Sequence, residues 1–212
     1  MSVLTPLQIE TLRMFFALPE SSGFLLAGGA ALVAQKLTKR PTHDLDFFSA
    51  PGTASVPAAR DAVEHAAASR GWQVDRIQDA ETFCRLKVAG MEEILLVDLA
   101  IDVAPAHATI STDLGPSFAP EELAGRKTIA LFDRAEARDF TDVHQLAERF
   151  GREILLARAA EIDNGFDRHV LASMMRTLDR FTDAELPVDG ISPTELRTYF
   201  SDWARELDAT EG

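Results

Sequence analysis

Two aspartates, Asp44 and Asp46, occupy alternate positions of the short segment His43–Phe48. The segment is otherwise typical of a β-strand, in which alternate side chains point to the same face, so we expect the two carboxylates to converge. Like charges side by side repel one another, and such a pair normally persists because a cation lies between them. Carboxylate oxygens suit Mg²⁺ or Mn²⁺, and Mg²⁺ is usually bound by one or two carboxylates together with substrate phosphates. The pair therefore predicts a divalent metal site.

A glycine pair, Gly28-Gly29, precedes these aspartates, with Gly29 fifteen residues before Asp44. The apolar run Phe24–Ala27 predicts a strand, and Ala30–Leu37, rich in Ala and Leu, predicts a helix. Glycine allows close approach of the backbone to a ligand, and the free amides at a helix start attract an anion. A phosphate-binding turn near a metal-binding carboxylate pair is the equipment for phosphoryl or nucleotidyl transfer. The alternative is that the two aspartates form only the polar face of an edge strand.

A third carboxylate is expected from the segment Ile94–Ile101. Its odd-numbered residues are apolar, while Asp98, and Asp102 just beyond its end, belong to the opposite face. An ionised aspartate in so apolar a strand is costly unless a partner compensates its charge, and a metal shared with Asp44 and Asp46 would do so. We assign the role to Asp98, with Asp102 as the alternative. An exposed edge strand is the other interpretation.

The hydrophobic pattern predicts an α+β protein with two domains. A helix is expected to begin at Thr5-Pro6, where Thr is a suitable cap and Pro suits the first turn. One further helix and three strands follow the carboxylate strand, at Pro57–Arg70, Trp72–Ile77, Thr82–Val88 and Ile94–Ile101. Pro105–Pro120 has the composition of a loop, and the chain from Glu121 onward has a helical pattern. We therefore expect an N-terminal domain over residues 1–112 and a helical C-terminal domain over residues 113–212.

Composition limits the setting in which the protein works. The single cysteine, Cys84, excludes an internal disulfide, fits a reducing cytoplasm and is expected to pack in the core. No segment is apolar for long enough to span a bilayer, so we expect a cytoplasmic protein without a membrane partner. The net charge of −13 disfavours tight, non-specific binding to nucleic acid. The five histidines lack the spacing of zinc ligands.

Several of these motifs resemble one family. The segments Leu26–Leu32 and Arg40-x-Thr42-x-Asp44-Leu45-Asp46-Phe47-Phe48 resemble the AbiEii-like nucleotidyltransferases, which include MenT-type toxins of type IV-like toxin–antitoxin systems. In the second half, Leu123–Lys127 and Arg138-Asp139-x-x-Asp142 are similar to the family's lysine helix and Arg-Asp-x-x-Asp motif. The wider DNA polymerase β-like superfamily usually has Gly-Ser where this chain has Gly28-Gly29, so the resemblance is to the toxin-like branch.

The resemblance implies a polymerase-β-like nucleotidyltransferase domain with a mixed sheet, followed by an all-helical domain. It implies transfer of a nucleoside monophosphate from an NTP, with Mg²⁺ or Mn²⁺, to an acceptor hydroxyl at the tRNA 3′ end, and a cognate antitoxin as partner. No DNA partner is expected. The implied residues fall into three sets: catalytic Asp44, Asp46, Asp98, Lys127 and Asp142; metal-binding Asp44, Asp46 and Asp98; and nucleotide-binding Gly28, Gly29, Arg40 and Lys127.

Two residues near these sets have other expected roles. Asp139 lies at a helix start, where a capping role explains it. Thr42 is a candidate regulatory site, because a phosphate on its hydroxyl would place negative charge beside the carboxylates and repel the incoming triphosphate.

Two other functions fit the same residues. The enzyme could modify a small molecule such as an aminoglycoside, or a protein side chain, and the acidic net charge would attract a cationic drug. Alternatively, the chain could be a non-catalytic binding module that keeps the fold. The full set of carboxylates together with Lys127 argues against the binding module.

Overall fold

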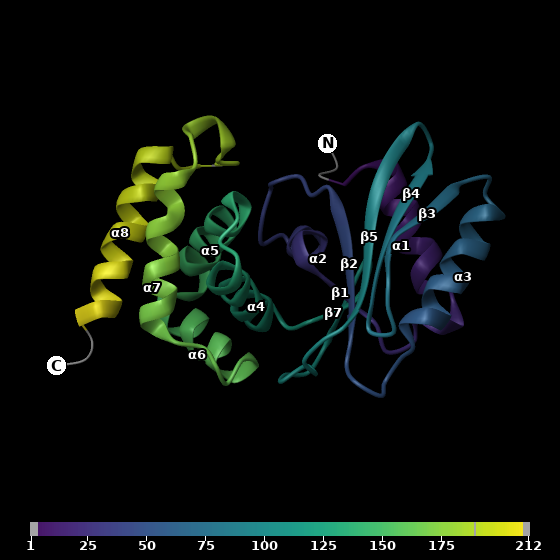
Figure 1. The fold of residues 1–212 in the computed structure, drawn as a ribbon, viewed down its shortest axis with the longest axis horizontal. Coiled ribbons are helices and arrows are strands. Elements are labelled where there is room, and N and C mark those ends of the chain that lie inside the picture. Colours follow the sequence, from purple (N-terminus) through teal and green to yellow (C-terminus); the bar gives the residue numbers. More distant parts are fainter. Residues whose placement is uncertain (1–3, 189, 210–212) are drawn as a thin grey trace. The chain divides into compact units, whose positions relative to one another are not determined.

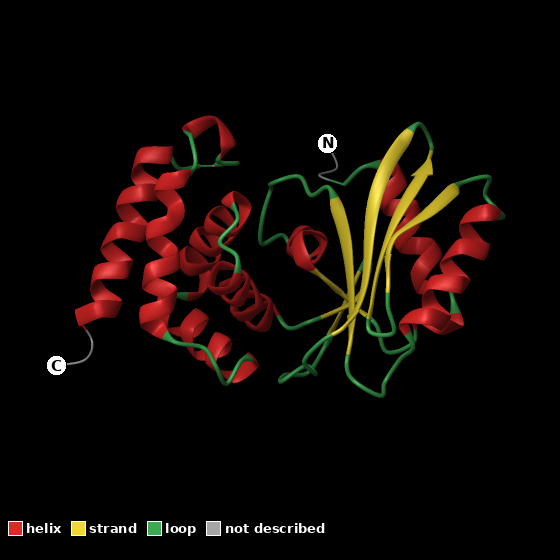
Figure 2. Ribbon diagram, viewed as in Figure 1, coloured by secondary structure: helices red, strands yellow, loops and turns green. Residues whose placement is uncertain are grey.

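The computed structural model describes residues 4–188 and 190–209. The chain forms two compact units, Met1–Ala119 and Pro120–Gly212, which we call the first and second units (Figure 1). The first unit is a sheet with helices and the second is helical (Figure 2). The expected α+β class, with a helical C-terminal part, is confirmed.

Within the described residues, the first unit contains a seven-stranded sheet in the order β3-β4-β5-β2-β1-β7-β6. The strands are β1 (Leu25–Ala27), β2 (Asp44–Ser49), β3 (Gln73–Asp79), β4 (Phe83–Gly90), β5 (Glu93–Ile101), β6 (Ile110–Thr112) and β7 (Gly115–Ser117). β2 runs parallel to β5 and β1 runs parallel to β7, whereas the other neighbours are antiparallel. The sheet is therefore mixed, as predicted.

Two helices, α1 (Pro6–Phe16) and α3 (Val56–Ala68), pack on one face of this sheet (Figure 1). The alternation of β2 explains why: Leu45 and Phe47 are fully buried, while Asp44 and Asp46, which alternate with them, are half-buried. Phe47 stacks on Phe15 of α1 with ring centroids 3.9 Å apart. Burying aromatic surface of this kind is the main stabilisation available to a sheet face. The opposite face of β2 carries Asp44 and Asp46, followed by the half-buried Phe48.

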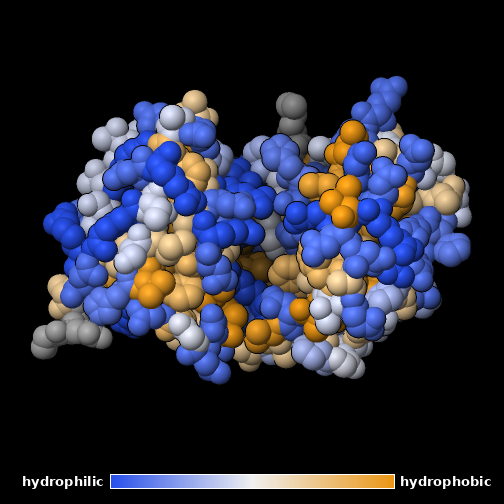
Figure 3. Space-filling view, in the orientation of Figure 1, coloured by the Kyte–Doolittle hydropathy of each residue, from blue (hydrophilic) through white to orange (hydrophobic). Residues whose placement is uncertain are grey.

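Cys84 lies on the helix-covered face of β4 and is fully buried. Burial raises the pKa of its thiol to about 11, so the group is protonated at neutral pH. The expected core-packing role is confirmed. The opposite face of β5 is more open, since Ile94 and Leu96 are exposed there. Figure 3 shows hydrophobic patches among the charged residues on the visible surface.

The segment expected as a loop, Pro105–Pro120, contains the hairpin β6–β7 instead. β7 joins the sheet through the pair Leu26 and Ser117, and the Ser117 hydroxyl donates to the carbonyl of Leu26 at 2.9 Å. Strands of three residues are too short to show an alternating pattern, and the Gly-Pro pair within them is typical of a turn. The loop prediction was therefore wrong at this hairpin. The boundary expected after residue 112 falls between its two strands.

The second unit consists of α4 (Pro120–Asp133), α5 (Ala137–Phe150), α6 (Arg152–Ile162), α7 (Arg168–Arg176) and α8 (Pro193–Ala209). Short 3-10 turns are η1 (Pro19–Ser21) in the first unit and η2 (Thr177–Arg180) and η3 (Asp183–Glu185) in the second. Phe140 of α5 meets Phe200 of α8 edge to face, with centroids 5.2 Å apart, and Trp203 stacks on Phe200. None of the helices in the described part of the chain has the length and apolarity that crossing a bilayer requires.

Candidate active site

The two aspartates of β2 lie on the sheet face opposite α1 and α3. Both are half-buried, whereas Leu45 between them is fully buried. The alternation predicted from the sequence is therefore present, and the carboxylates share one face.

A row of residues crosses the sheet at this level. Asp46 is in register with Ala27 of β1 on one side and with Asp98 of β5 on the other. Asp98 is in turn opposite Arg85 of β4. Residues in register on neighbouring strands point to the same face, so Asp98 shares the face of Asp44 and Asp46.

The alternative third acid, Asp102, lies beyond the last residue of β5. Its amide donates to the carbonyl of Ser49 at 2.8 Å, and its carboxylate accepts from the Val103 amide at 2.8 Å. The register thus brings Asp98 beside Asp46, and Asp102 level with the end of β2.

Asp98 is 6% exposed and is held by a two-point ion pair with Arg85. The guanidinium Nε lies 2.8 Å from Oδ1, and Nη2 lies 2.6 Å from Oδ2. The hydrogen bonds to Asp98 are the main reason that the pKa of Arg85 lies above its usual value, and the charges of Asp46 and Asp44 act in the same direction. The sequence did not predict a role for Arg85, because its contact with Asp98 arises only when β4 pairs with β5.

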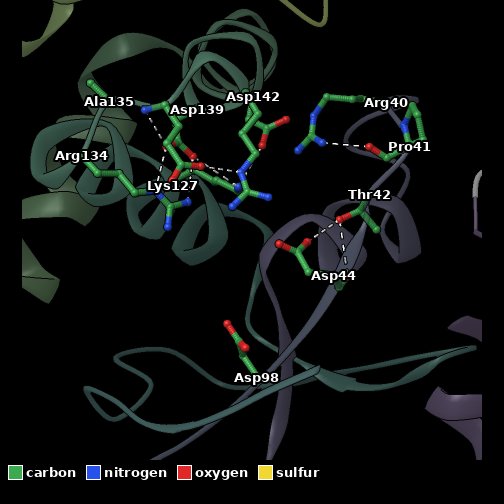
Figure 4. Close-up of polar contacts among 12 residues, drawn as sticks. Arg40, Pro41, Thr42, Asp44, Asp98, Lys127, Arg134, Ala135, Asp139 and Asp142 are labelled. Carbon is green, nitrogen blue, oxygen red and sulfur yellow. Dashed lines mark hydrogen bonds and ion pairs between the residues drawn. The ribbon is translucent and has the colours of Figure 1, made fainter. Parts of the chain in front are cut away.

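We tested whether these residues fit a divalent metal. Among the residues described, no cluster of three or more His, Cys, Asp or Glu side chains is arranged to hold an ion. Asp98 is paired with Arg85. Asp44 accepts a hydrogen bond from Thr42 (Figure 4). Asp44 and Asp46 nevertheless supply the two carboxylates that Mg²⁺ commonly uses alongside phosphate oxygens. The donor set fits such an ion, and Asp98 can join it only in competition with Arg85.

The glycine turn packs directly against the carboxylate strand. Gly28 has φ +58° and begins α2 (Gly28–Ala34), which is earlier than predicted. A Cβ at Gly28 would lie 1.7 Å from Oδ2 of Asp46, and a Cβ at Gly29 would lie 2.5 Å from Oγ1 of Thr42. Only glycine permits both the left-handed backbone and this contact. The glycines therefore allow close approach of the backbone to the acid pair itself.

The loop before β2 is fixed by buried hydrogen bonds. The Thr42 hydroxyl donates to Oδ1 of Asp44 at 2.9 Å, and the Thr42 carbonyl accepts from Nε2 of Gln8 at 2.8 Å. Arg40 is 7% exposed and donates from Nη1 to the carbonyl of Pro41 at 2.9 Å (Figure 4). Gln8 was not predicted: the pattern Thr5-x-x-Gln8 indicates a capping box, which is present, but not this contact with Thr42.

In the second unit, Lys127 of α4 is held between two aspartates of α5 (Figure 4). Its Nζ lies 2.9 Å from Oδ2 of Asp142 and 3.7 Å from Oδ1 of Asp139. Lys127 is 7% exposed, and both aspartates are 0% exposed. The three residues therefore form a buried charge cluster, which we call the lysine cluster.

Asp139 has the helix-start role expected of it. Its Oδ2 accepts from the amide of Glu136 at 3.2 Å, which completes a capping box at the start of α5. It also accepts from Arg134, with Nε to Oδ2 at 3.0 Å and Nη2 to Oδ1 at 3.2 Å. The cap is confirmed, and the two cations on Asp139 are an addition that the sequence did not predict.

The fold, a mixed sheet followed by a helical unit, has counterparts among nucleotidyltransferases of solved structure. A crystal structure of a nucleotidyltransferase candidate from H. pylori has 18% identity and a TM-score of 0.64, covering 94% of this chain and 92% of the other. JHP933 from Helicobacter pylori has 18% identity and a TM-score of 0.60, with 96% and 93% covered. The MenT4 nucleotidyltransferase toxin from Mycobacterium tuberculosis H37Rv has 14% identity and a TM-score of 0.56, with 95% and 89% covered. These likenesses establish the nucleotidyltransferase fold.

The family model described as nucleotidyl transferase AbiEii toxin, type IV TA system, matches residues 11–209. The chain therefore belongs to this family of nucleotidyltransferase toxins. No curated protein matches the sequence.

Proposed function

We propose that this protein transfers a nucleoside monophosphate from an NTP to an acceptor hydroxyl, releasing pyrophosphate, and that the acceptor is the 3′ end of tRNA. The observation that carries the proposal is the register of Asp46 with Asp98 on parallel strands, with the Gly28 backbone against the Asp46 carboxylate. Acids on one sheet face beside a glycine turn combine sites for a cation and for phosphate oxygens.

In this proposal Asp44 and Asp46 hold Mg²⁺ or Mn²⁺, and Asp98 is the third acid. An ion held by these carboxylates would supply Lewis-acid chemistry for the attacking hydroxyl and positive charge for the leaving pyrophosphate. Thr42 orients the Asp44 carboxylate through the 2.9 Å hydrogen bond. The amides of Gly28 and Gly29, which carry no side-chain cap, contact the triphosphate.

Arg40, Lys127 and Asp142 have supporting roles in the proposal. Arg40 stiffens the loop that leads to Asp44, and Lys127 meets the nucleotide phosphates as a point charge. For Lys127 this requires that a phosphate oxygen partly replace the Asp142 carboxylate, which lies 2.9 Å from Nζ.

Membership of a family of toxin–antitoxin toxins supports the antitoxin partner, and the tRNA acceptor is the one that the resemblance described above implies. A nucleotide added to the tRNA 3′ end would prevent aminoacylation and so block translation, and a cognate antitoxin would restrain the enzyme. The reaction belongs in the cytoplasm, where NTPs and tRNA meet. The net charge of −13 makes general RNA binding unfavourable, so selectivity would come from a local surface of the enzyme.

The test is to incubate the purified protein with each α-labelled NTP and Mg²⁺, with and without total tRNA, beside an Asp46→Asn control. We expect label on RNA from one or two nucleotides, and none with the control. Label on the protein alone, or on an added aminoglycoside, would support the alternative acceptors. Absence of transfer with every acceptor would favour the binding module.

A further inference from the structure

We propose that Arg85 is an internal counter-ion that competes with the divalent cation for Asp98, and so sets the metal affinity of the site. The inference rests on the proposed function, because it concerns the metal which that function requires. Arg85 belongs to none of the residue sets that the sequence predicted.

Arg85 contacts Asp98 through a two-point ion pair. Arg85 and Asp98 are opposite each other on β4 and β5, and both guanidinium contacts are short, at 2.8 and 2.6 Å. A two-point contact uses both carboxylate oxygens of Asp98. Although each oxygen keeps a second lone pair, a divalent cation bound there would lie close to the guanidinium charge, so the two cations compete for Asp98.

The two partners of this ion pair differ in exposure. The Arg85 side chain is 44% exposed, whereas that of Asp98 is 9% exposed. Arg85 can return to water at little cost, but Asp98 cannot remain buried without a compensating cation. An exchange in which one cation replaces another keeps Asp98 compensated throughout.

The surroundings of Arg85 are negatively charged. Asp44 and Asp46 share the face with Asp98, and their charges already act on Arg85. Arg85 therefore offsets repulsion among three acids.

The consequence concerns metal loading. The apparent affinity for a ligand falls by the fraction of molecules whose site is competent to bind it. With Arg85 on Asp98, the free protein offers a cation mainly Asp44 and Asp46. The phosphates of an NTP would supply the remaining charge, so the metal would bind best together with the nucleotide.

The experiment measures Mn²⁺ binding by the loss of the free-ion EPR signal in wild type, Arg85→Gln and Lys87→Gln. Lys87 is a matched control: it stands two residues further along β4 on the same face, its side chain is 39% exposed, and it pairs with Asp75 at 3.4 Å rather than with Asp98. Both substitutions remove one positive charge from the same strand. Only Arg85→Gln removes the competitor of the metal.

We expect Arg85→Gln to bind Mn²⁺ roughly tenfold more tightly than wild type, and Lys87→Gln to stay within about twofold. Arg85→Lys should lie between them, since a lysine keeps the charge without the two-point contact. The gain should vanish in the double variant Arg85→Gln/Asp98→Asn. Added Mn²⁺ should also raise the Tm of Arg85→Gln more than that of wild type.

Equal affinities for Arg85→Gln and Lys87→Gln, or weaker binding by Arg85→Gln, would overturn the inference. This failure can be told from failure of the proposed function. If wild type binds Mn²⁺ and transfers label to RNA, only the role of Arg85 is wrong. If no variant binds Mn²⁺ and wild type transfers no label, both the proposed metal-dependent function and the role of Arg85 are wrong.

Discussion

Two groups of aspartates carry the candidate chemistry, one in each unit, and they differ in exposure and in the cations that hold them. In the first unit Asp44 and Asp46 are half-buried on the sheet face opposite α1 and α3. In the second unit Asp139 and Asp142 are 0% exposed, and Lys127 lies between them in the lysine cluster. Both groups have the aspartate spacing expected of an active site, but only the first leaves its acids close to solvent.

The difference teaches that acidic residue type and spacing do not by themselves define a site. A buried acid with a fixed cation must lose that partner before it can bind a ligand, and breaking such a pair costs about 3–5 kcal/mol. For a half-buried acid the cost is smaller, because water shares in compensating its charge. We therefore expect the first group to bind a ligand at lower cost than the second, in which Lys127 of α4 is paired with Asp142 of α5.

The largest expected effect tests the first group. Asp44→Asn or Asp46→Asn should lower the rate of nucleotide transfer by about 10³-fold or more, because a bound metal supplies several kcal/mol of transition-state stabilisation. The Tm without metal should not fall, since each change relieves repulsion between like charges. Initial rates of labelled transfer and thermal unfolding of the same preparations measure both effects.

The control for this prediction is Asp102→Asn, which changes an acid at the end of β5, away from the row of Asp46 and Asp98. It should transfer at a near-normal rate, whereas Asp98→Asn should not. The reverse pattern would make Asp102 the third acid. Near-normal transfer by Asp44→Asn would show that the acid pair is not the metal site.

The second prediction tests whether the lysine cluster is structural, catalytic or both. Lys127→Met should destabilise the protein by about 3 kcal/mol, because it removes one partner of the 2.9 Å ion pair with the fully buried Asp142. For a chain of this length, that is a fall in Tm of roughly 6–12 °C. The double variant Lys127→Met/Asp142→Asn should recover most of the loss, since both charges are then absent. Thermal unfolding of the single and double variants measures this.

Activity then separates the two roles. If Lys127 meets the triphosphate, the recovered double variant should still transfer about 10²- to 10³-fold more slowly than wild type. A stable and fully active double variant would show that the lysine cluster has only a structural role. Asp139→Asn should leave activity nearly unchanged, because Asn is also a good cap, although its loss of charge at Arg134 and Lys127 should lower the Tm.

The comparison also shows what the sequence could predict. The alternation in β2, the glycine turn and the position of Asp98 on the polar face of its strand are local patterns, and local patterns follow from strand periodicity and backbone freedom. Their partners are not local. Arg85 meets Asp98 across two strands, and Gln8 reaches Thr42 from the first helix, so neither contact has a signal along the chain.

The burial of Asp142 also has no clear signal in the sequence. It lies at the border of an apolar helical stripe, and a border position is compatible with a cleft or with a buried charge pair. Only the packing of α4 against α5 decides between them, by bringing Lys127 to 2.9 Å. The hairpin β6–β7 was missed because its strands are three residues long.

The third prediction compares two glycines with similar backbones. Gly28 (φ +58°) faces Asp46, whereas a Cβ added at Gly52 (φ +72°) would meet none of the described atoms within 4 Å. Gly52→Ala should cost about 1–2 kcal/mol of stability from its left-handed backbone and keep activity. Gly28→Ala should cost the same strain and also displace the Asp46 carboxylate, so that transfer is lost. Equal activity in the two variants would mean that contact with Asp46 does not matter.

The smallest effect is expected at Thr42, which is 3% exposed and donates its hydroxyl to Asp44. Thr42→Val keeps the shape but loses the donor, and a hydrogen bond to a charged group contributes about 1.5–3 kcal/mol. Because Asp44 is half-buried and water can replace part of that bond, we expect roughly tenfold slower transfer. Initial rates at saturating Mg²⁺ and NTP measure it.

Thr42→Ser is the matched control, since it keeps the hydroxyl and loses only a methyl group. Serine should therefore transfer near the normal rate while valine does not. The same hydrogen bond bears on regulation: a phosphate on Thr42 would have to break it, and would add negative charge beside Asp44. Thr42→Glu should then lose NTP binding in a direct titration, beyond the effect of valine. If valine and serine are equally slow, the methyl packing matters rather than the hydroxyl, and Thr42 does not position Asp44.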